Sequence, residues 1–352
     1  MNKKYKIALV IGSGMFATSM ASVLANNFNL VIIKVRRDEI YQMFKAGENS
    51  AYLPGIKLPT NVIPALSWAE VDTLRGSSLS DIEIIVSGLP SAAIKEYFAD
   101  YQGEISRYLK LNIPFVSLTK GIDPIDLKLS DDILFDYFNP YRDLITFLSG
   151  PSFAEEILQQ QITLVSLAGR SNKTLTQVSN MLNTPFFKLF PTYDIKGVLL
   201  GGALKNVLAI AGGIIEELGY NHNTRAALIT AGIADMLRFG VVFNARSESF
   251  YGFSGMGDLI LTTTGNLSRN KIFGMEIARG ENSEKNIQEI LAKHHTVIEG
   301  YQTAKAAQLI SERYDIKCKI FNGVYSVLYE NANPTAVINN LMDFSSRVKT
   351  LF

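Results

Sequence analysis

A glycine-rich turn near the amino terminus has the residues and spacing of a dinucleotide-binding loop. Gly12, Gly14 and Ala17 follow an apolar run, KIALVI, and open a stretch with helical patterning. The first glycine permits a tight bend, the second lets the backbone approach a pyrophosphate, and the small third residue allows close helix–strand packing. Free N–H groups at the helix start would bind the phosphates. The turn therefore predicts a dinucleotide site, with a purely structural turn as the alternative.

The end of the next apolar run, LVIIKV, decides which dinucleotide we expect. A site specific for NAD commonly places an acidic residue there to bind the ribose 2′-hydroxyl. This chain has Arg36, Arg37 and Asp38 at that point. Two guanidinium groups favour a 2′-phosphate, so NADP(H) is the preferred cofactor, and Asp38 keeps NAD(H) as an accepted one. The alternative is an ordinary solvated turn.

Two lysines and an aspartate stand where acid–base chemistry is plausible. Lys205 lies among small apolar residues in GGALKNVLAIAGGI, where lost solvation would lower its pKa toward a working range. Lys120 follows a buried strand in a turn, TKG. Asp258 follows glycine-rich backbone and would either orient Lys205 or only cap a helix. Reducing a ketone needs a hydride donor, a proton donor and clamps for the charged end of the substrate.

A phosphate clamp is one interpretation of the short motif Ser268-Arg269-Asn270. A guanidinium binds phosphate oxygens in pairs, and a helix that starts at this point would add free N–H groups. The alternative is that Ser268 only caps the helix.

The expected secondary structure around these residues changes along the chain. Up to about Pro191, short β-branched runs alternate with amphipathic stretches, which is typical of a parallel sheet with helices. After that point the chain becomes helix-like and rich in Ala, Gly and Leu. We therefore predict an α/β plus all-α protein. Residues 1–191 would form a Rossmann-type, doubly wound dinucleotide-binding domain, and residues 192–352 an all-helical domain that binds substrate and carries the catalytic residues.

Composition excludes several classes of function. The 352 residues are 47% hydrophobic, and 34 Lys and Arg against 33 Asp and Glu leave a net charge of +1. No overall field attracts nucleic acid or an anionic membrane. A single cysteine and three histidines, two of them adjacent, give no metal-ligand spacing.

We expect the amino-terminal apolar run to be a buried strand rather than a signal peptide. We expect Gly197–Ile215 to be a buried helix rather than a membrane span, because Lys205 interrupts it. A metal-free cytoplasmic protein is expected.

Longer motifs identify the chain with a known family. The blocks SLTKGID, SGPSFAEE, GGALKNVLAIAGGI and GFSGMGDLILTTTGNLSRNKIFG, together with NSAYLPGIKLPTNV and TVIEGYQTAKA, run in order along almost the whole sequence. In this respect the chain resembles the NAD(P)-dependent glycerol-3-phosphate dehydrogenases. One departure is Gly14-Met15-Phe16-Ala17, where the family usually has Gly-Ser-aromatic-Gly, so a serine contact at position 15 is absent.

The resemblance implies roles for individual residues. Lys205 corresponds to the catalytic lysine and Lys120 to a second lysine facing substrate and nicotinamide. Asp258 matches the substrate-binding set of the family and is counted with the two lysines as catalytic. The implied substrate-binding residues are Lys120, Gly150, Ser152, Lys205, Asp258, Ser268, Arg269 and Asn270. The implied cofactor-binding residues are Gly12, Gly14, Met15, Phe16, Ala17, Arg36, Arg37, Lys120, Ala154, Arg269, Val297 and Glu299.

The activity implied is reversible hydride transfer between NAD(P)H and dihydroxyacetone phosphate, giving sn-glycerol 3-phosphate for phospholipid synthesis. Two alternatives stay open: a β-hydroxy-acid dehydrogenase of similar architecture, and a non-catalytic dinucleotide-binding sensor. The expected partner is the small substrate, with no nucleic acid and no integral membrane segment. The small-residue helices around 201–236 would pack either within the domain or across a homodimer.

Overall fold

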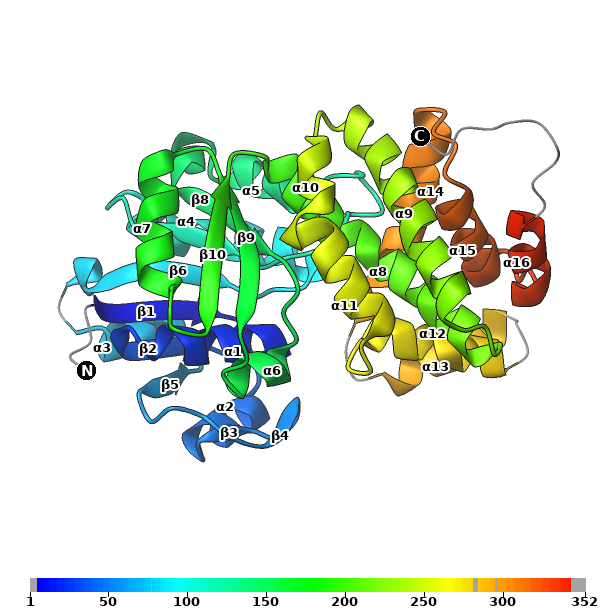
Figure 1. The fold of residues 1–352 in the computed structure, drawn as a ribbon. Coiled ribbons are helices and arrows are strands. Elements are labelled where there is room, and N and C mark those ends of the chain that lie inside the picture. The colour runs from blue at the N-terminus through cyan, green and yellow to red at the C-terminus, as the bar shows by residue number, and fades with distance from the viewer. Residues whose placement is uncertain (1–4, 77, 281–283, 295–296, 343–352) are drawn as a thin grey trace. The chain divides into compact units, whose positions relative to one another are not determined.

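The computed structural model describes residues 5–76, 78–280, 284–294 and 297–342, and the chain divides into two compact units (Figure 1). The first unit comprises Met1–Thr119 and Asp131–Ile195, and the second comprises Lys120–Ser130 and Lys196–Phe352. The division near residue 195 lies four residues after the expected boundary. The sequence predicts that the segment 120–130 belongs to the first domain, whereas in the structure it belongs to the second unit.

The first unit is built on an eight-stranded sheet with the order β10-β9-β8-β7-β6-β1-β2-β5. Its strands are β1 (Tyr5–Ile11), β2 (Phe28–Lys34), β5 (Val62–Ala65), β6 (Ile82–Ser87), β7 (Phe115–Ser117), β8 (Ile145–Ser149), β9 (Thr163–Gly169) and β10 (Phe187–Thr192). The strands from β5 to β8 in this order are all parallel. The predicted Rossmann-type sheet is confirmed, and the apolar runs KIALVI and LVIIKV correspond to β1 and β2.

Two strands depart from the purely parallel sheet that the sequence predicted. β9 pairs antiparallel with β8, and β10 pairs parallel with β9. At the opposite end β5 is an edge strand, which explains how it accommodates Pro64 within a sheet. A separate two-stranded ribbon of β3 (Glu48–Asn49) and β4 (Leu53–Lys57) lies in the excursion between β2 and β5.

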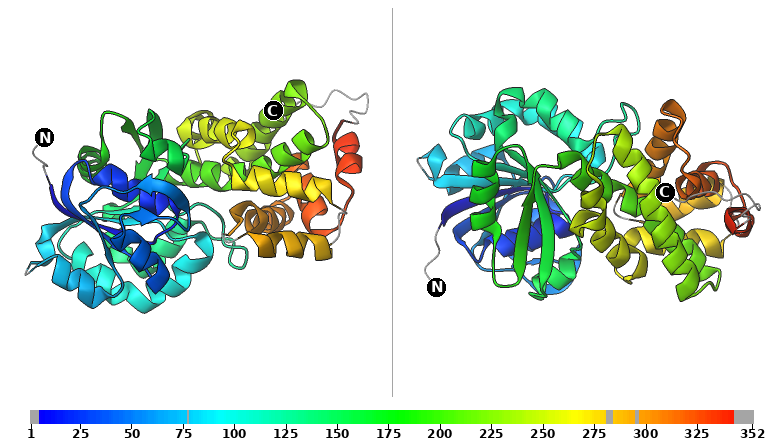
Figure 2. Two further views of the ribbon diagram at one scale, coloured as in Figure 1. Left: turned by 90° about the horizontal axis from the view of Figure 1, so that it is seen from below. Right: turned by 45° about the horizontal axis from the view of Figure 1, so that its top comes forward.

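Helices cover both faces of this sheet (Figure 2). Because strand side chains alternate, neighbours such as Phe115 and Val116 point to opposite faces. Val116 belongs to the core shared with α1 (Met15–Leu24) and α7 (Asn172–Leu182). Phe115 contacts Phe98 of α4 (Ile94–Leu109), and α5 (Ser130–Tyr137) lies on the same side. The remaining helices are α2 (Asp38–Lys45), α3 (Trp68–Leu74) and α6 (Ala154–Leu158), with short 3-10 turns at Leu79–Asp81, Ser91–Ala93 and Asn139–Leu144.

The second unit contains helices, and its described residues after 195 include no strand. The helices are α8 (Ile195–Glu217), α9 (His222–Val242), α10 (Ser247–Tyr251), α11 (Asp258–Thr264), α12 (Arg269–Arg279), α13 (Glu284–Lys293), α14 (Glu299–Arg313), α15 (Lys319–Tyr329) and α16 (Pro334–Met342). A single π turn, Phe253–Gly257, precedes α11. The segment 120–130 closes on itself through a bridge between Ile122 and Leu129.

Glycines let the central helix of the second unit approach its neighbours closely. α8 is long and apolar enough to cross a membrane, but its apolar stretch lies wholly inside the protein. A Cβ atom on Gly213 would lie 1.9 Å from the Lys271 carbonyl oxygen, and one on Gly201 would lie 2.5 Å from that of Ser254. Only glycine fits at such distances. The Gly201 contact brings the π turn, and with it the start of α11, against α8.

Candidate active site

The turn after β1 has a backbone suited to a dinucleotide pyrophosphate. Gly12 has φ +102°, a conformation that favours glycine, and a Cβ there would lie 3.1 Å from the Gly88 carbonyl oxygen. Gly14 is the N-cap of α1, and among the described residues no atom beyond its own chain neighbours lies within 4 Å of the position its Cβ would take. No acidic side chain stands in the first turn of α1. Open space beside Gly14, the N–H groups of a helix start and a first turn without acidic side chains fit a diphosphate.

The first turn of α1 also packs tightly against the sheet. A Cβ on Gly88, just after β6, would lie 2.6 Å from the Ala17 Cβ. A larger side chain at either position would therefore push the helix away from the strand. Met15 and Phe16 are half-buried in the same turn. The short side chains at 17 and 88 keep the start of α1 close to the ends of β1 and β6.

Arg36 and Arg37 are both exposed after β2, and one of them has a partner that the sequence did not indicate. Arg37 Nη2 donates to the Tyr52 hydroxyl at 2.7 Å, and its guanidinium carbon lies 5.9 Å from the Tyr52 ring centroid. Tyr52 lies 15 residues along the chain, and no local pattern pairs the two. Asp38 begins α2, where a carboxylate is favourable next to the helix N-terminus. That position gives Asp38 a structural role of its own.

Three predicted residues come together inside the second unit. Asp258 is the first residue of α11 and is only 1% exposed. Its Oδ2 accepts from Lys120 Nζ at 2.8 Å, and its Oδ1 pairs with Lys205 Nζ. One carboxylate thus bridges two ammonium groups. Lys205 is buried in the middle of α8, whereas the Lys120 side chain keeps 14% of its surface exposed.

Thr262 completes this cluster and was missed by the sequence analysis. Its Oγ1 accepts from Lys205 Nζ at 3.0 Å and donates to the Asp258 backbone carbonyl oxygen, one turn earlier in α11. The signal in the sequence was the spacing of Asp258 and Thr262, because residues four apart share a helix face. Neither residue alone shows that this face meets Lys205.

The surroundings of Lys205 bring its pKa closer to neutral, which suits this lysine to proton transfer. Burial, the largest cause, lowers the pKa of Lys205 to about 8. The Asp258 carboxylate opposes this shift, and the positive charge of Lys120 adds to it. A group with a pKa near 8 exchanges its proton readily close to neutral pH, as a general acid or base must.

The Ser268-Arg269-Asn270 motif forms the start of α12. Ser268 is the N-cap, and its Oγ accepts from the Lys271 N–H at 3.3 Å, so the helix-capping alternative is observed. Arg269 is exposed at the first helical position. Asn270 Oδ1 accepts from the Gly300 N–H at 2.9 Å, which ties α12 to the start of α14. Capping leaves the Ser268 hydroxyl hydrogen free to donate, so it does not exclude a phosphate contact.

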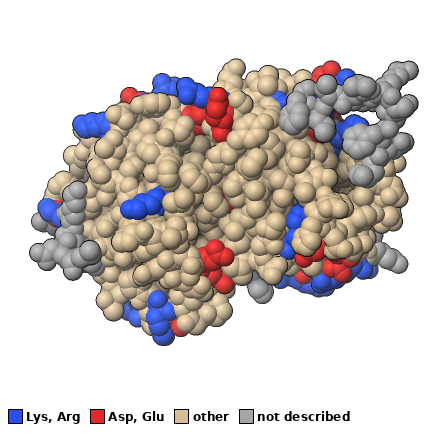
Figure 3. All heavy atoms as spheres, in the orientation of Figure 1, with Lys and Arg blue, Asp and Glu red and all other residues tan. Residues whose placement is uncertain are grey.

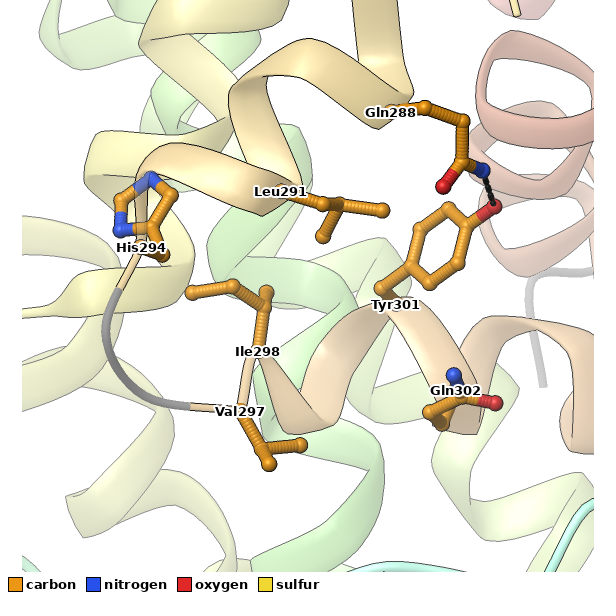
Figure 4. Close-up of a pocket in the computed structure, with 7 residues that line it drawn as sticks. All are labelled: Gln288, Leu291, His294, Val297, Ile298, Tyr301 and Gln302. Atoms are coloured by element: carbon orange, nitrogen blue, oxygen red, sulfur yellow. Dashed lines mark hydrogen bonds between the residues drawn. The ribbon is translucent and has the colours of Figure 1, made fainter.

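The late cofactor-binding candidates lie beside this junction. Glu299 is the first residue of α14, and its Oε2 accepts from Asn206 Nδ2 at 3.4 Å. Val297 is 45% exposed and borders a cavity of about 400 Å³ (Figure 4). The cavity is lined by Gln288, Leu291, His294, Val297, Ile298, Tyr301 and Gln302. Its polar edge includes a contact of 3.3 Å between Gln288 Nε2 and the Tyr301 hydroxyl.

Gly150, Ser152 and Ala154 belong to the first unit, in the loop from β8 to α6. A Cβ on Gly150 would lie 2.8 Å from the Val165 Cα in β9, so this loop requires glycine. Ser152 Oγ donates to the Gly150 carbonyl oxygen at 2.8 Å, and Ala154 begins α6. Among the described residues, no group of three His, Cys, Asp or Glu side chains could hold a metal ion.

Comparison with known proteins agrees with this geometry. A family model described as the N-terminus of NAD-dependent glycerol-3-phosphate dehydrogenase matches residues 6–175, and one for the C-terminus matches residues 194–339. The chain belongs to this family.

Relatives and solved structures of the family cover almost the whole chain. It is 35% identical over 338 residues to glycerol-3-phosphate dehydrogenase [NAD(P)+] of Solidesulfovibrio magneticus, covering 96% of this chain and 98% of the relative. The corresponding Myxococcus xanthus protein is 37% identical over 338 residues, covering 95% and 96%. The crystal structure of glycerol-3-phosphate dehydrogenase from Coxiella burnetii superposes with a TM-score of 0.82 at 27% identity, covering 97% of this chain and 99% of that one.

Proposed function

We propose that this chain is an NAD(P)-dependent sn-glycerol-3-phosphate 2-dehydrogenase that interconverts dihydroxyacetone phosphate and sn-glycerol 3-phosphate. The observation that carries the proposal is the buried Asp258 carboxylate bridging Lys120 and Lys205 in a chain of this family. The glycine-rich turn Gly12–Ala17, to which we assign the dinucleotide diphosphate, belongs to the first unit, and the cluster of Lys120, Lys205 and Asp258, to which we assign the substrate carbonyl, belongs to the second.

In this proposal Lys205 handles the proton. When bound, the nicotinamide supplies the hydride to the substrate carbonyl carbon, or accepts it in the reverse direction. Lys205 donates its Nζ proton to the C2 oxygen during reduction and takes it back, as the neutral amine, during oxidation. Asp258 and Thr262 accept hydrogen bonds from Nζ and thereby hold the ammonium group in one orientation. A pKa of about 8 leaves most Lys205 side chains protonated at neutral pH.

Lys120 has an electrostatic role rather than a proton-transfer role. Its ammonium group would stabilise the negative charge that develops on the C2 oxygen, an effect worth about 3 kcal/mol for a single well-placed donor. The ion pair with Asp258 limits where its Nζ can lie. Its partial exposure suits a group that contacts substrate and nicotinamide.

We assign the phosphate of the substrate to Ser268, Arg269 and Asn270 at the start of α12. This helix has eleven residues, and its first turn contains no acidic side chain to repel a phosphate. Gly150 and Ser152, in the first unit, are proposed as further substrate contacts. Proposed cofactor contacts besides the glycine-rich turn come from Met15, Phe16, Arg36, Arg37, Lys120, Ala154, Arg269, Val297 and Glu299.

The cofactor assignment favours NADPH and allows NADH. Arg37, supported by Tyr52, and Arg36 present positive charge after β2, where a 2′-phosphate would lie.

Further proposals follow from the family: a cytoplasmic enzyme, a homodimer, and a product that feeds phospholipid synthesis. Charged groups of both signs are scattered over the face drawn in Figure 3, and no broad basic surface for nucleic acid is visible there.

The deciding experiment is oxidation of NAD(P)H in the presence of a panel of ketones. Dihydroxyacetone phosphate should be reduced, and its non-phosphorylated analogue dihydroxyacetone should be a far poorer substrate. Turnover of a β-keto acid instead would favour a β-hydroxy-acid dehydrogenase. Binding of NADPH with no turnover of any ketone would favour a sensor. Size-exclusion chromatography with light scattering tests the homodimer separately.

A further inference from the structure

Asn49 binds the glycine-rich turn from inside the first unit. It is the last residue of β3, and its side chain is completely buried. Its Nδ2 donates to the Ser13 carbonyl oxygen at 2.9 Å and to Thr18 Oγ1 at 2.8 Å. Thr18 Oγ1 in turn donates to the Gly14 carbonyl oxygen at 2.9 Å. Asn49 therefore holds the Ser13 carbonyl directly and supports the Gly14 carbonyl through the Thr18 hydroxyl. The Gly14 carbonyl oxygen also accepts from the Thr18 backbone N–H at 2.9 Å.

This arrangement fixes the direction of the N–H groups on the other side of the turn. In a planar trans peptide, the N–H points away from the carbonyl of the preceding residue. With the Ser13 and Gly14 carbonyls held toward Asn49 and Thr18, the N–H groups of Gly14 and Met15 must point the opposite way. Apart from the adjoining backbone, no atom of the described residues lies within 4 Å of the Gly14 Cβ position, so the turn has room there for a ligand.

The contacts also show which end of the amide faces the turn. The Ser13 carbonyl oxygen can only accept, so the atom facing it is Nδ2 and not Oδ1. Asn49 Oδ1 is buried and has no hydrogen-bond partner in the described part of the chain. An unpaired buried carbonyl costs stability, so packing alone would be better served by an apolar residue. The contribution of Asn49 to the structure is therefore the two hydrogen bonds that its Nδ2 donates.

We propose that Asn49 is a positioning residue for the dinucleotide. It holds the turn so that the N–H groups of Gly14 and Met15 are aimed at the diphosphate before the cofactor arrives. The inference rests on the proposed dinucleotide site at Gly12–Ala17. Because the diphosphate is common to NADH and NADPH, Asn49 acts on both cofactors equally, whereas Arg36 and Arg37 act on the 2′-phosphate.

Dissociation constants of the purified full-length protein test this role. We expect Asn49→Ala to weaken the binding of NADH, NADPH and ADP-ribose by a similar factor of about ten, which is the effect of losing one hydrogen bond to a charged group. Binding of adenosine 2′-monophosphate, which has no diphosphate, should change less than twofold, and so should the KM for dihydroxyacetone phosphate. The matched control is Asn61→Ala, because Asn61 Nδ2 donates to the carbonyl oxygens of Ala25 and Phe28 away from the turn. This control should leave the four dissociation constants and the KM unchanged.

A second pair of variants keeps the test decisive if Asn49→Ala does not fold. Thr18→Val removes the hydroxyl that links Asn49 to Gly14 and should weaken the binding of ADP-ribose. Thr18→Ser retains the hydroxyl and should bind ADP-ribose as the wild type does. Unchanged affinity for ADP-ribose in Asn49→Ala, or equal losses for ADP-ribose and adenosine 2′-monophosphate, would overturn the inference. A wild-type protein that binds neither NADH nor NADPH would instead overturn the proposed function.

Discussion

Lys120 and Asp258 are joined by an ion pair of 2.8 Å between Nζ and Oδ2, although 138 positions separate them in the chain. The carboxylate is almost fully buried and has its other oxygen on Lys205. A buried carboxylate with two cationic partners is compensated for its lost hydration, and it holds both ammonium groups at defined positions.

Replacing Lys205 should stop the chemistry and spare the cofactor. Lys205→Met is expected to lower kcat by about 10²–10⁴-fold, the usual contribution of a general acid or base. Binding of NADPH should stay within a few-fold, because the lysine acts on the substrate oxygen. Steady-state kinetics and fluorescence titration of NADPH measure the two effects. Lys305→Met, at an exposed position of α14, is the control, and near-normal turnover in folded Lys205→Met would remove this residue from catalysis.

The reaction should show opposite pH dependences in its two directions. Burial lowers the pKa of Lys205 to about 8, and reduction needs the protonated form while oxidation needs the neutral amine. kcat/KM for reduction is therefore expected to fall as the pH rises through about 8, and kcat/KM for oxidation to rise over the same range. Profiles from pH 6 to 10 that show no inflection near 8 in either direction would contradict the assignment.

Removing the charge of Asp258 should move that inflection. The carboxylate opposes the lowering of the Lys205 pKa, so Asp258→Asn lets it fall further. The decline in reduction rate should then begin at a lower pH, and stability should drop by about 3–5 kcal/mol because a buried ion pair is broken. Asp235→Asn is the matched control, since Asp235 is also buried in the second unit but pairs with Arg238. A profile that moves equally in both variants would refute a specific role for Asp258.

Arg269 should bind the phosphate of the substrate. Arg269→Ala is expected to raise the KM for dihydroxyacetone phosphate by about tenfold or more, because a charge-assisted hydrogen bond is worth about 1.5–3 kcal/mol. Some loss of NADPH affinity should accompany it. Arg279→Ala, at the other end of α12, removes an exposed guanidinium paired with Glu217 and should leave both constants unchanged. If KM and NADPH affinity are both normal in Arg269→Ala, the residue has no part in the site.

Cofactor preference should depend on the two arginines after β2. Replacing Arg36 and Arg37 together by Ala should erode the preference for NADPH and affect NADH much less. Raising the ionic strength should weaken the preference in the wild type, because both side chains are exposed and salt screens them. kcat/KM for both cofactors at low and high salt measures this. A wild-type enzyme that prefers NADH tenfold would show that Asp38 or another residue controls the ribose pocket.

Local sequence was sufficient to predict the elements of the sheet and the turn after β1. Buried parallel strands appear as continuous apolar runs, and a strand, a Gly-x-Gly turn and a helix occupy consecutive residues. The strands β9 and β10 were not anticipated as an antiparallel extension, although ITLVSLAG is itself an apolar run. Strand direction depends on which partner a strand meets, and that partner is not encoded in the strand alone.

The sequence also singled out Lys120, Lys205 and Asp258, because their motifs match the family, but it left open whether Asp258 orients a lysine or caps a helix. Only the tertiary structure decided this: Gly201 allows the turn before α11 to approach α8, which places Asp258 between the two lysines. Tyr52, Thr262 and Asn49 were not identified for the same reason. Each acts through a partner on another segment, and hydrogen bonds of this kind depend on packing between elements, which no local pattern of residue types records.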